Sequence, residues 1–232
     1  MNAAPSVLRA ALPEWFPEEE RVVRALVRHQ PFYRWRRPRY LVCLLRDLAV
    51  LLPQARCRVL DVGGGSGVVG QMVADFFPGK TVTAIDVADR FLPTLAIPHR
   101  TFDGRTIPFP DRSFDCALFS NVLHHVPRAL RAPLLREALR VTGGACVVVK
   151  DHLADSAFDR ARLAWLDLVG NLPFGGMLRA EYLGSTDWEA LFEAVGCKAL
   201  RLAVSAYRGG AGRLAFPNRL EVCFRLAPAA RE

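Results

Sequence analysis

Short apolar runs alternate with amphipathic segments through the middle of the chain. Apolar runs bounded by turn-forming residues predict strands at 58–62, 81–87, 114–120 and 145–150, and a further short strand is expected at 99–102. Apolar positions at helical spacing predict helices between them, at 67–77, 88–95 and 127–141. Strands that alternate with helices in this way predict a parallel sheet.

The two flanks of this region follow different patterns. Two helices are predicted before it, at 18–30 and 39–52, joined by a segment rich in aromatic residues and arginine. After it we expect a helix at 156–169, a loop at 171–177, a helix that begins at Thr186 or Asp187, and antiparallel strands at 199–206 and 219–226. The prediction is therefore an α/β fold with a seven-stranded, mostly parallel sheet and an antiparallel last strand.

A glycine-rich turn follows the first predicted strand. Residues 59–70 read V-L-D-V-G-G-G-S-G-V-V-G, a strand, a turn and the start of a helix. Glycine permits a tight turn or a close backbone approach, and a helix N-terminus offers free N–H groups to a polar ligand. The G-x-G-x-x-G pattern at 65–70 also occurs in dinucleotide enzymes. Asp61 before the first glycine would repel a pyrophosphate but suits the cationic amino-acid end of S-adenosylmethionine (SAM).

The turn thus resembles that of class I SAM-dependent methyltransferases, and a second segment carries the resemblance further. Residues 102–115 are similar to the D-x-x-x-L-P-F-x-D-x-S-F-D stretch of methyltransferase type 11 domains, which include enzymes of ubiquinone and menaquinone synthesis. Residues 119–126 resemble the end of the fourth strand in the same family. The resemblance spans roughly 55–152 and implies a Rossmann-like SAM-binding domain at 55–232, an N-terminal helical lid at 1–54 and a substrate-covering insertion at 153–185.

The resemblance and the strand ends together indicate which residues hold SAM. Asp86 ends the second strand, where a carboxylate can accept both ribose hydroxyls of an adenosine, although NAD enzymes use an acid there too. In the family, the acid at Asp103 hydrogen-bonds the adenine amino group. The predicted cofactor residues are Asp61, Gly63, Gly65, Asp86, Val87, Phe102, Asp103, Gly104 and Asn121.

Methyl transfer from a sulfonium needs mainly alignment, but a hydroxyl or an acidic carbon also needs a base. His152 and His124 lie at predicted strand ends and are the candidate catalytic residues, each with an alternative role as a structural histidine. Tyr33 in the lid and Trp165 and Phe174 in the insertion are predicted to bind an apolar substrate. The cysteines do not have the spacing of a zinc site, and no metal ligand is predicted.

These features favour O- or C-methylation of a small apolar metabolite such as a lipid, a quinone or a polyketide. Because residues 120–123 lack the N/D-P-P-Y/F signature of enzymes that methylate base nitrogens, an RNA methyltransferase is the weaker alternative, with nucleic acid an unexpected partner. A third reading is a SAM-binding scaffold or cyclase that does not methylate, since no catalytic group is compelling.

Charge and cysteine content bear on partners and compartment. The net charge is +8, and residues 21–46 hold eight arginines and no acid. This region is either a solvated helical face or a surface for an acidic carrier protein or a membrane. The six cysteines form no C-x-x-C pair and the N-terminus lacks a signal-peptide pattern. We therefore expect reduced, buried cysteines in a cytoplasmic protein.

Overall fold

The computed structural model describes residues 7–8, 11–171, 179–202, 204–210 and 212–229. Its eight strands form one sheet in the order β1-β7-β8-β6-β5-β2-β3-β4. β8 alone runs antiparallel to its neighbours, between β6 and β7. The strands are β1 (Val7–Leu8), β2 (Cys57–Val62), β3 (Lys80–Asp86), β4 (His99–Thr101), β5 (Cys116–Ser120), β6 (Val147–His152), β7 (Cys197–Leu202) and β8 (Glu221–Pro228).

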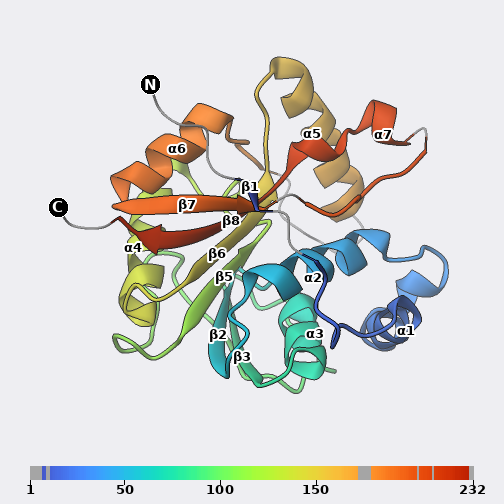
Figure 1. The fold of residues 1–232 in the computed structure, drawn as a ribbon, viewed down its shortest axis with the longest axis horizontal. Helices are drawn as coiled ribbons and strands as arrows, with labels where there is room; N and C mark the ends of the chain where they lie inside the picture. The colour runs from blue at the N-terminus through green and yellow to red at the C-terminus, as the bar shows by residue number, and fades with distance from the viewer. Residues whose placement is uncertain (1–6, 9–10, 172–178, 203, 211, 230–232) are drawn as a thin grey trace.

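Helices cover both faces of the sheet (Figure 1). α2 and α3 belong to one buried apolar cluster, whereas the apolar residues of α4 and α6 belong to a second cluster on the other side. The helices are α1 (Glu19–His29), α2 (Arg39–Leu51), α3 (Val68–Phe76), α4 (Arg128–Thr142), α5 (Ala157–Asn171), α6 (Ser185–Ala194) and α7 (Gly212–Ala215), with 3₁₀ turns η1 (Pro31–Arg34) and η3 (Asn218–Leu220). None of these described helices is long and apolar enough to cross a bilayer.

The seven predicted strands and the antiparallel last strand are confirmed. The two-residue strand β1 is an addition, which pairs in parallel with the end of β7. The helix predicted at 88–95 is wrong, because this segment forms bends and a turn. Pro93 has no N–H to donate, and the N–H of Leu92 donates to the carbonyl of Ser66 at 3.2 Å, so the hydrogen bonds that would close a helix here are not available.

Strand β6 ends two residues later than predicted, at His152 instead of Lys150. Strand β6 continues through Asp151 and His152, which are both buried. Apolar patterning ended this strand at Lys150, since polar residues usually mark a loop. The predicted burial of all six cysteines is confirmed, and all six are free.

Candidate functional site

The glycine turn lies at the carboxyl end of β2, between β5 and β3. Gly63, Gly65 and Gly67 have φ values of +74°, +57° and +76°, which side chains other than glycine rarely adopt. A Cβ on Gly65 would meet no protein atom within 4 Å, whereas one on Gly63 would lie 2.7 Å from the Val122 side chain. The backbone at Gly65 is therefore open to a ligand, while Gly63 is needed for packing.

Two buried carboxylates belong to this turn. Asp86 Oδ2 accepts a hydrogen bond from the N–H of Gly65 at 2.8 Å, and its Oδ1 accepts one from Ala88 at 3.0 Å. Asp61 Oδ2 is buried and has no hydrogen-bond partner among the described residues. Burial and the nearby Asp86 raise the pKa of Asp61 to about 7. Two carboxylates beside an open glycine backbone suit a ligand that carries a positive charge, such as SAM.

The remaining predicted cofactor residues surround the same strand ends. The N–H of Phe102 donates to the carbonyl of Asp86 at 3.0 Å. A Cβ on Gly104 would lie 2.9 Å from the exposed side chain of Val87, so these two residues abut. Asp103 is exposed, and its Oδ1 accepts the N–H groups of residues 105 and 106, which lowers the pKa of Asp103. The structure therefore places these residues at the carboxyl ends of neighbouring strands, and their binding of SAM stays a prediction.

Asn121 connects this turn to a second polar cluster. It follows β5 with a φ of +57°, a conformation that asparagine tolerates better than most residues. Its Oδ1 accepts hydrogen bonds from Lys150 Nζ at 2.8 Å and from the Tyr40 hydroxyl at 3.0 Å. Lys150 is fully buried and lies 2.5 Å from Glu221 Oε2. Neither Lys150 nor Glu221 was predicted as a site residue, although each is a charge within an apolar run.

The pairing of β6 with β8 explains how Glu221 reaches the candidate base. His152 and Glu221 are directly paired across these antiparallel strands, and His152 Nδ1 lies 3.1 Å from Glu221 Oε2. Lys150 is two residues before His152 and so shares its face of the strand. Burial opposes the ionisation of Glu221, but Lys150 and His152 outweigh it and hold its pKa well below the usual range. Glu221 is therefore an ionised, buried carboxylate beside His152 Nδ1, although this contact does not have hydrogen-bond geometry.

His124 lies between two other carboxylates. Its Nδ1 is 2.5 Å from Asp151 Oδ1, and its Nε2 is 3.3 Å from Asp167 Oδ2, on α5. Burial alone would lower the pKa of His124, but Asp151 and Asp167 outweigh it and raise the pKa to about 9. A histidine that is protonated at neutral pH is a poor base, so this geometry favours His152 over His124 for that role.

Asp167 joins the two histidines. Its Oδ1 lies 4.0 Å from His152 Nε2, and its Oδ2 accepts a hydrogen bond from the Tyr182 hydroxyl at 2.5 Å. The Tyr182 ring stacks on His124 with 5.4 Å between ring centroids. Asp167 could not be identified from the sequence, because a functional acid on an amphipathic helix has the same sequence pattern as a solvent-exposed acid.

Two of the three predicted substrate residues lie within the described residues. Tyr33 is half-buried and packs against the apolar cluster of α2 and α3. Trp165 on α5 is 58% exposed, and Phe174 lies outside the described residues. The end of α1 contacts the loop after β3, since His29 Nδ1 lies 2.9 Å from the hydroxyl of Thr94.

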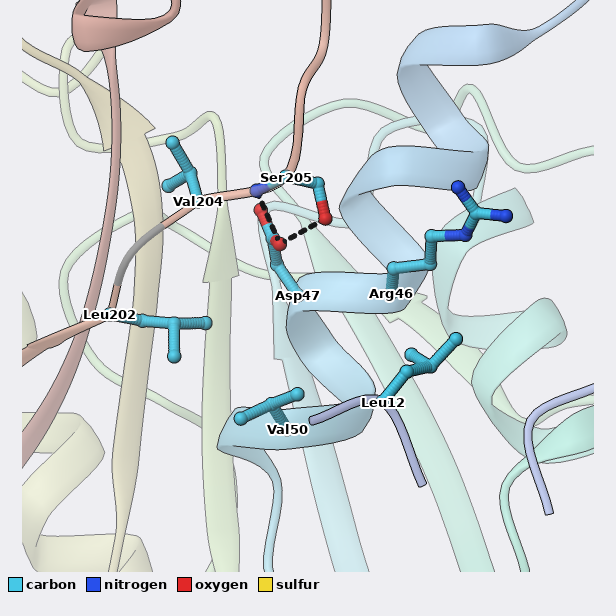
Figure 2. Close-up of a pocket in the computed structure, with 7 residues that line it drawn as sticks. All are labelled: Leu12, Arg46, Asp47, Val50, Leu202, Val204 and Ser205. Carbon is cyan, nitrogen blue, oxygen red and sulfur yellow. Dashed lines mark hydrogen bonds between the residues drawn. The ribbon is translucent and has the colours of Figure 1, made fainter. Parts of the chain in front are cut away.

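A cavity of about 300 Å³ lies elsewhere, between α2 and the segment after β7 (Figure 2). Asp47 on α2 accepts hydrogen bonds there from both the N–H and the hydroxyl of Ser205, at 2.9 and 2.6 Å. None of the predicted site residues is among the described residues that line it. These hydrogen bonds anchor α2 to the sheet, and the cavity is not part of the candidate site.

Comparison with known proteins identifies the family. The methyltransferase domain family matches residues 29–202. The mouse acetylserotonin O-methyltransferase is 31% identical over 175 residues, which cover 66% of this chain and 44% of that protein. The demethylspheroidene O-methyltransferase of Rhodobacter capsulatus is 32% identical over 112 residues, 45% of this chain and 28% of that protein. The chain thus spans less than half the length of these curated relatives.

A solved structure agrees at the level of the fold. The SAM-dependent methyltransferase of Thermotoga maritima superposes with a TM-score of 0.59 at 16% identity, covering 88% of this chain and 98% of that one. The strand order with an antiparallel last strand, the glycine turn with its two carboxylates and the family match agree with one another. The chain belongs to the methyltransferase domain family and has the fold of this SAM-dependent methyltransferase.

Proposed function

We propose that this methyltransferase transfers the methyl group of SAM to a hydroxyl oxygen of a small, largely apolar metabolite, with His152 as the general base. The observation that carries the proposal is the buried pair of His152 and Glu221, 3.1 Å apart at the end of β6. This contact does not have hydrogen-bond geometry, but the nearby negative charge favours the imidazole hydrogen on Nδ1, which leaves Nε2 available to accept a proton. In sheets of this kind, ligands bind at the carboxyl ends of the strands, where His152 also lies.

The chain's own residues have distinct parts in this reaction. Bound SAM supplies a methyl group already activated on a sulfonium. Asp86 holds the ribose, Asp61 adds negative charge near the amino-acid end, and the open backbone at Gly65 allows close approach. His152 Nε2 takes the proton of the acceptor hydroxyl, while Glu221 stabilises the resulting imidazolium. Asn121 and Lys150 keep Glu221 fixed relative to the cofactor turn.

Two findings support the choice of an oxygen acceptor on an apolar molecule. Both relatives described above are named as O-methyltransferases, one for acetylserotonin and one for demethylspheroidene. A hydroxyl is a weak nucleophile until it loses its proton, so a positioned base suits an oxygen acceptor. Exposed apolar side chains on α5, including Phe158 and Trp165, supply a surface that an apolar substrate or its covering loop can contact.

We also propose that the arginine-rich segment at 21–46 binds an anionic partner, which is either an acidic carrier protein or a membrane. Arg37 pairs with Glu19 and Glu20, and Arg46 pairs with Glu19, so part of the charge is neutralised internally. Trp35 is 90% exposed between Arg34 and Arg36, which are exposed too. Binding to anionic but not to neutral lipid vesicles would support the membrane, and binding to neither vesicle would leave the carrier.

An acceptor screen tests the proposed reaction. Purified protein is incubated with isotope-labelled SAM and four panels of acceptors: apolar hydroxylated aromatics, polyenes with hydroxyl groups, amines and RNA. We expect methylation in the hydroxyl panels, with the label on oxygen by mass spectrometry. Labelling of amines or RNA alone would contradict the proposal, as would binding of SAM without transfer in any panel.

A further inference from the structure

Three side chains at the buried end of the site have the geometry of metal ligands. His124, His125 and Asp167 each place one ligand atom so that all three atoms lie within 4.8 Å of one another. His124 Nε2 and Asp167 Oδ2 are 3.3 Å apart. Bonds of about 2.0–2.1 Å in a tetrahedral zinc site put neighbouring ligand atoms about 3.3 Å apart. These two atoms are therefore already at a suitable separation.

The other nitrogen of each histidine is held by an acceptor. His124 Nδ1 lies 2.5 Å from Asp151 Oδ1, and His125 Nδ1 lies 2.8 Å from the carbonyl oxygen of Arg179. A carbonyl oxygen can only accept, so His125 carries its hydrogen on Nδ1 and a lone pair on Nε2 when neutral. Metal-binding histidines are usually oriented in this way by a carboxylate or a carbonyl.

One of the proposed ligand atoms lacks a partner. His124 Nε2 is buried, and its distance of 3.3 Å to Asp167 does not have hydrogen-bond geometry, so this nitrogen makes no hydrogen bond among the described residues. A buried polar atom without a partner costs about 1–3 kcal/mol. The Tyr182 hydroxyl donates to Asp167 Oδ2 and orients that carboxylate toward the histidines. A bound cation would satisfy His124 Nε2 without moving Asp167.

We propose that His124, His125 and Asp167 bind a divalent transition-metal ion of the zinc class, with Asp151 orienting His124. Within the described residues, the ion pairs of Asp151 and Asp167 are all with histidines. Because His124 is protonated at neutral pH, the cation would replace its Nε2 proton and take over the balance of these carboxylates. Two imidazole nitrogens and one carboxylate oxygen suit zinc, iron or nickel, whereas magnesium and calcium prefer oxygen alone.

Three protein ligands leave a coordination position for water or for an acceptor oxygen, as in catalytic zinc sites. The second of these roles rests on the proposed function, whereas metal binding itself does not. His152 lies on the other side of Asp167, with its Nε2 4.0 Å from Oδ1, and keeps its role as the base.

Zinc binding by the untagged chain tests this site. The protein is stripped with a chelator and titrated with zinc by calorimetry, and bound metal is counted by mass spectrometry after dialysis. We expect one zinc ion per chain, and visible absorption typical of four-coordinate cobalt when Co²⁺ replaces zinc. His125→Ala and Asp167→Asn should each weaken zinc binding at least tenfold. His99→Ala is the matched control, because His99 is an exposed histidine on β4 and should not change binding.

Thermal unfolding and SAM affinity show whether each variant is folded. The cobalt spectrum is measured on the unaltered chain, so it tests the site even if a variant does not fold. Fewer than one bound zinc ion per unaltered chain would overturn the proposed metal site. Zinc affinities of both variants equal to that of the unaltered chain would overturn it too. One bound zinc without O-methylation would instead contradict the proposed function and leave the metal site intact.

Discussion

The cofactor turn and the histidine cluster lie at the same edge of the sheet but are built differently. The turn is formed by nearby segments at 61–70, 86–87 and 102–104, and its functional groups are backbone atoms and two carboxylates. The cluster gathers side chains from four separate elements, the loop after β5, the end of β6, α5 and the start of β8. The turn binds through its backbone shape and so suits one common cofactor. The cluster is made of side chains, which can be exchanged to suit different substrates.

The largest effect is expected from breaking the cluster's buried ion pair. Lys150→Met leaves Glu221 without its buried ammonium, and losing one partner of such a pair costs about 3–5 kcal/mol of unfolding free energy. We expect the lower part of this range, because Arg208 still lies 2.6 Å from Glu221 Oε1. Denaturant unfolding measures the change. Lys198→Met on β7, an exposed lysine, should change stability by less than about 0.5 kcal/mol; equal losses in both variants would remove the special role of this pair.

The next largest effect separates chemistry from cofactor binding. His152→Ala should slow methyl transfer about 10²-fold, because a positioned base typically contributes about 10²–10⁴-fold. Its SAM affinity should remain within twofold, since no cofactor residue is altered. Turnover is measured with the best acceptor from the screen, and His99→Ala provides the control. Unchanged turnover would remove His152 from the catalytic residues and leave alignment alone as the mechanism.

A smaller effect is expected at the cofactor turn. Asp86→Ala should weaken SAM binding by about 1–3 kcal/mol, because the ribose hydroxyls lose an acceptor. The N–H of Gly65 also loses its partner, which loosens the turn. Calorimetric titration with SAM measures the loss. Asp89→Ala removes an exposed carboxylate three residues away and should leave the affinity unchanged; an equal loss there would mean that general charge, not the position of Asp86, attracts SAM.

The smallest expected effect is a pH dependence of SAM affinity. Burial and Asp86 raise the pKa of Asp61 to about 7, so lowering the pH through 7 converts its carboxylate to the neutral acid. The neutral acid no longer attracts the cationic cofactor, and the affinity should fall as the pH drops from about 8 to about 6. Titrations of the unaltered chain and of Asp61→Asn over this range check the prediction. The variant should bind more weakly at pH 8 and show no such dependence; an identical pH profile would exclude Asp61 as its source.

The same contrast explains what could be predicted from the sequence. Residues 59–70 are contiguous, so the strand, the glycine turn, the helix and their ligand could be predicted together. Asp86 and Asn121 could then be assigned to the same site, because they follow at the carboxyl ends of later strands. In the cluster, only the histidines could be predicted. Asp167 and Glu221 reach them through the packing of α5 and the pairing of β8 with β6, which local patterns do not encode.

Local exceptions follow from single residues. Apolar spacing predicted a helix at 88–95, but Pro93 lacks an N–H and the N–H of Leu92 donates to Ser66 instead. The limit of β6 was set two residues early, because Asp151 and His152 are polar although they are buried. The predicted division of the chain at residue 54 stays a prediction, as do the roles of Tyr33 and Trp165 toward a substrate.

A crystal structure with S-adenosylhomocysteine tests the central claim most directly, that the glycine turn and the histidine cluster are two halves of one site. We predict the ribose hydroxyls at Asp86, the adenine edge at Asp103, and the sulfur facing the space beside His152 Nε2. A cofactor bound elsewhere, or one whose sulfur faces away from His152 and is enclosed by protein, would contradict the account.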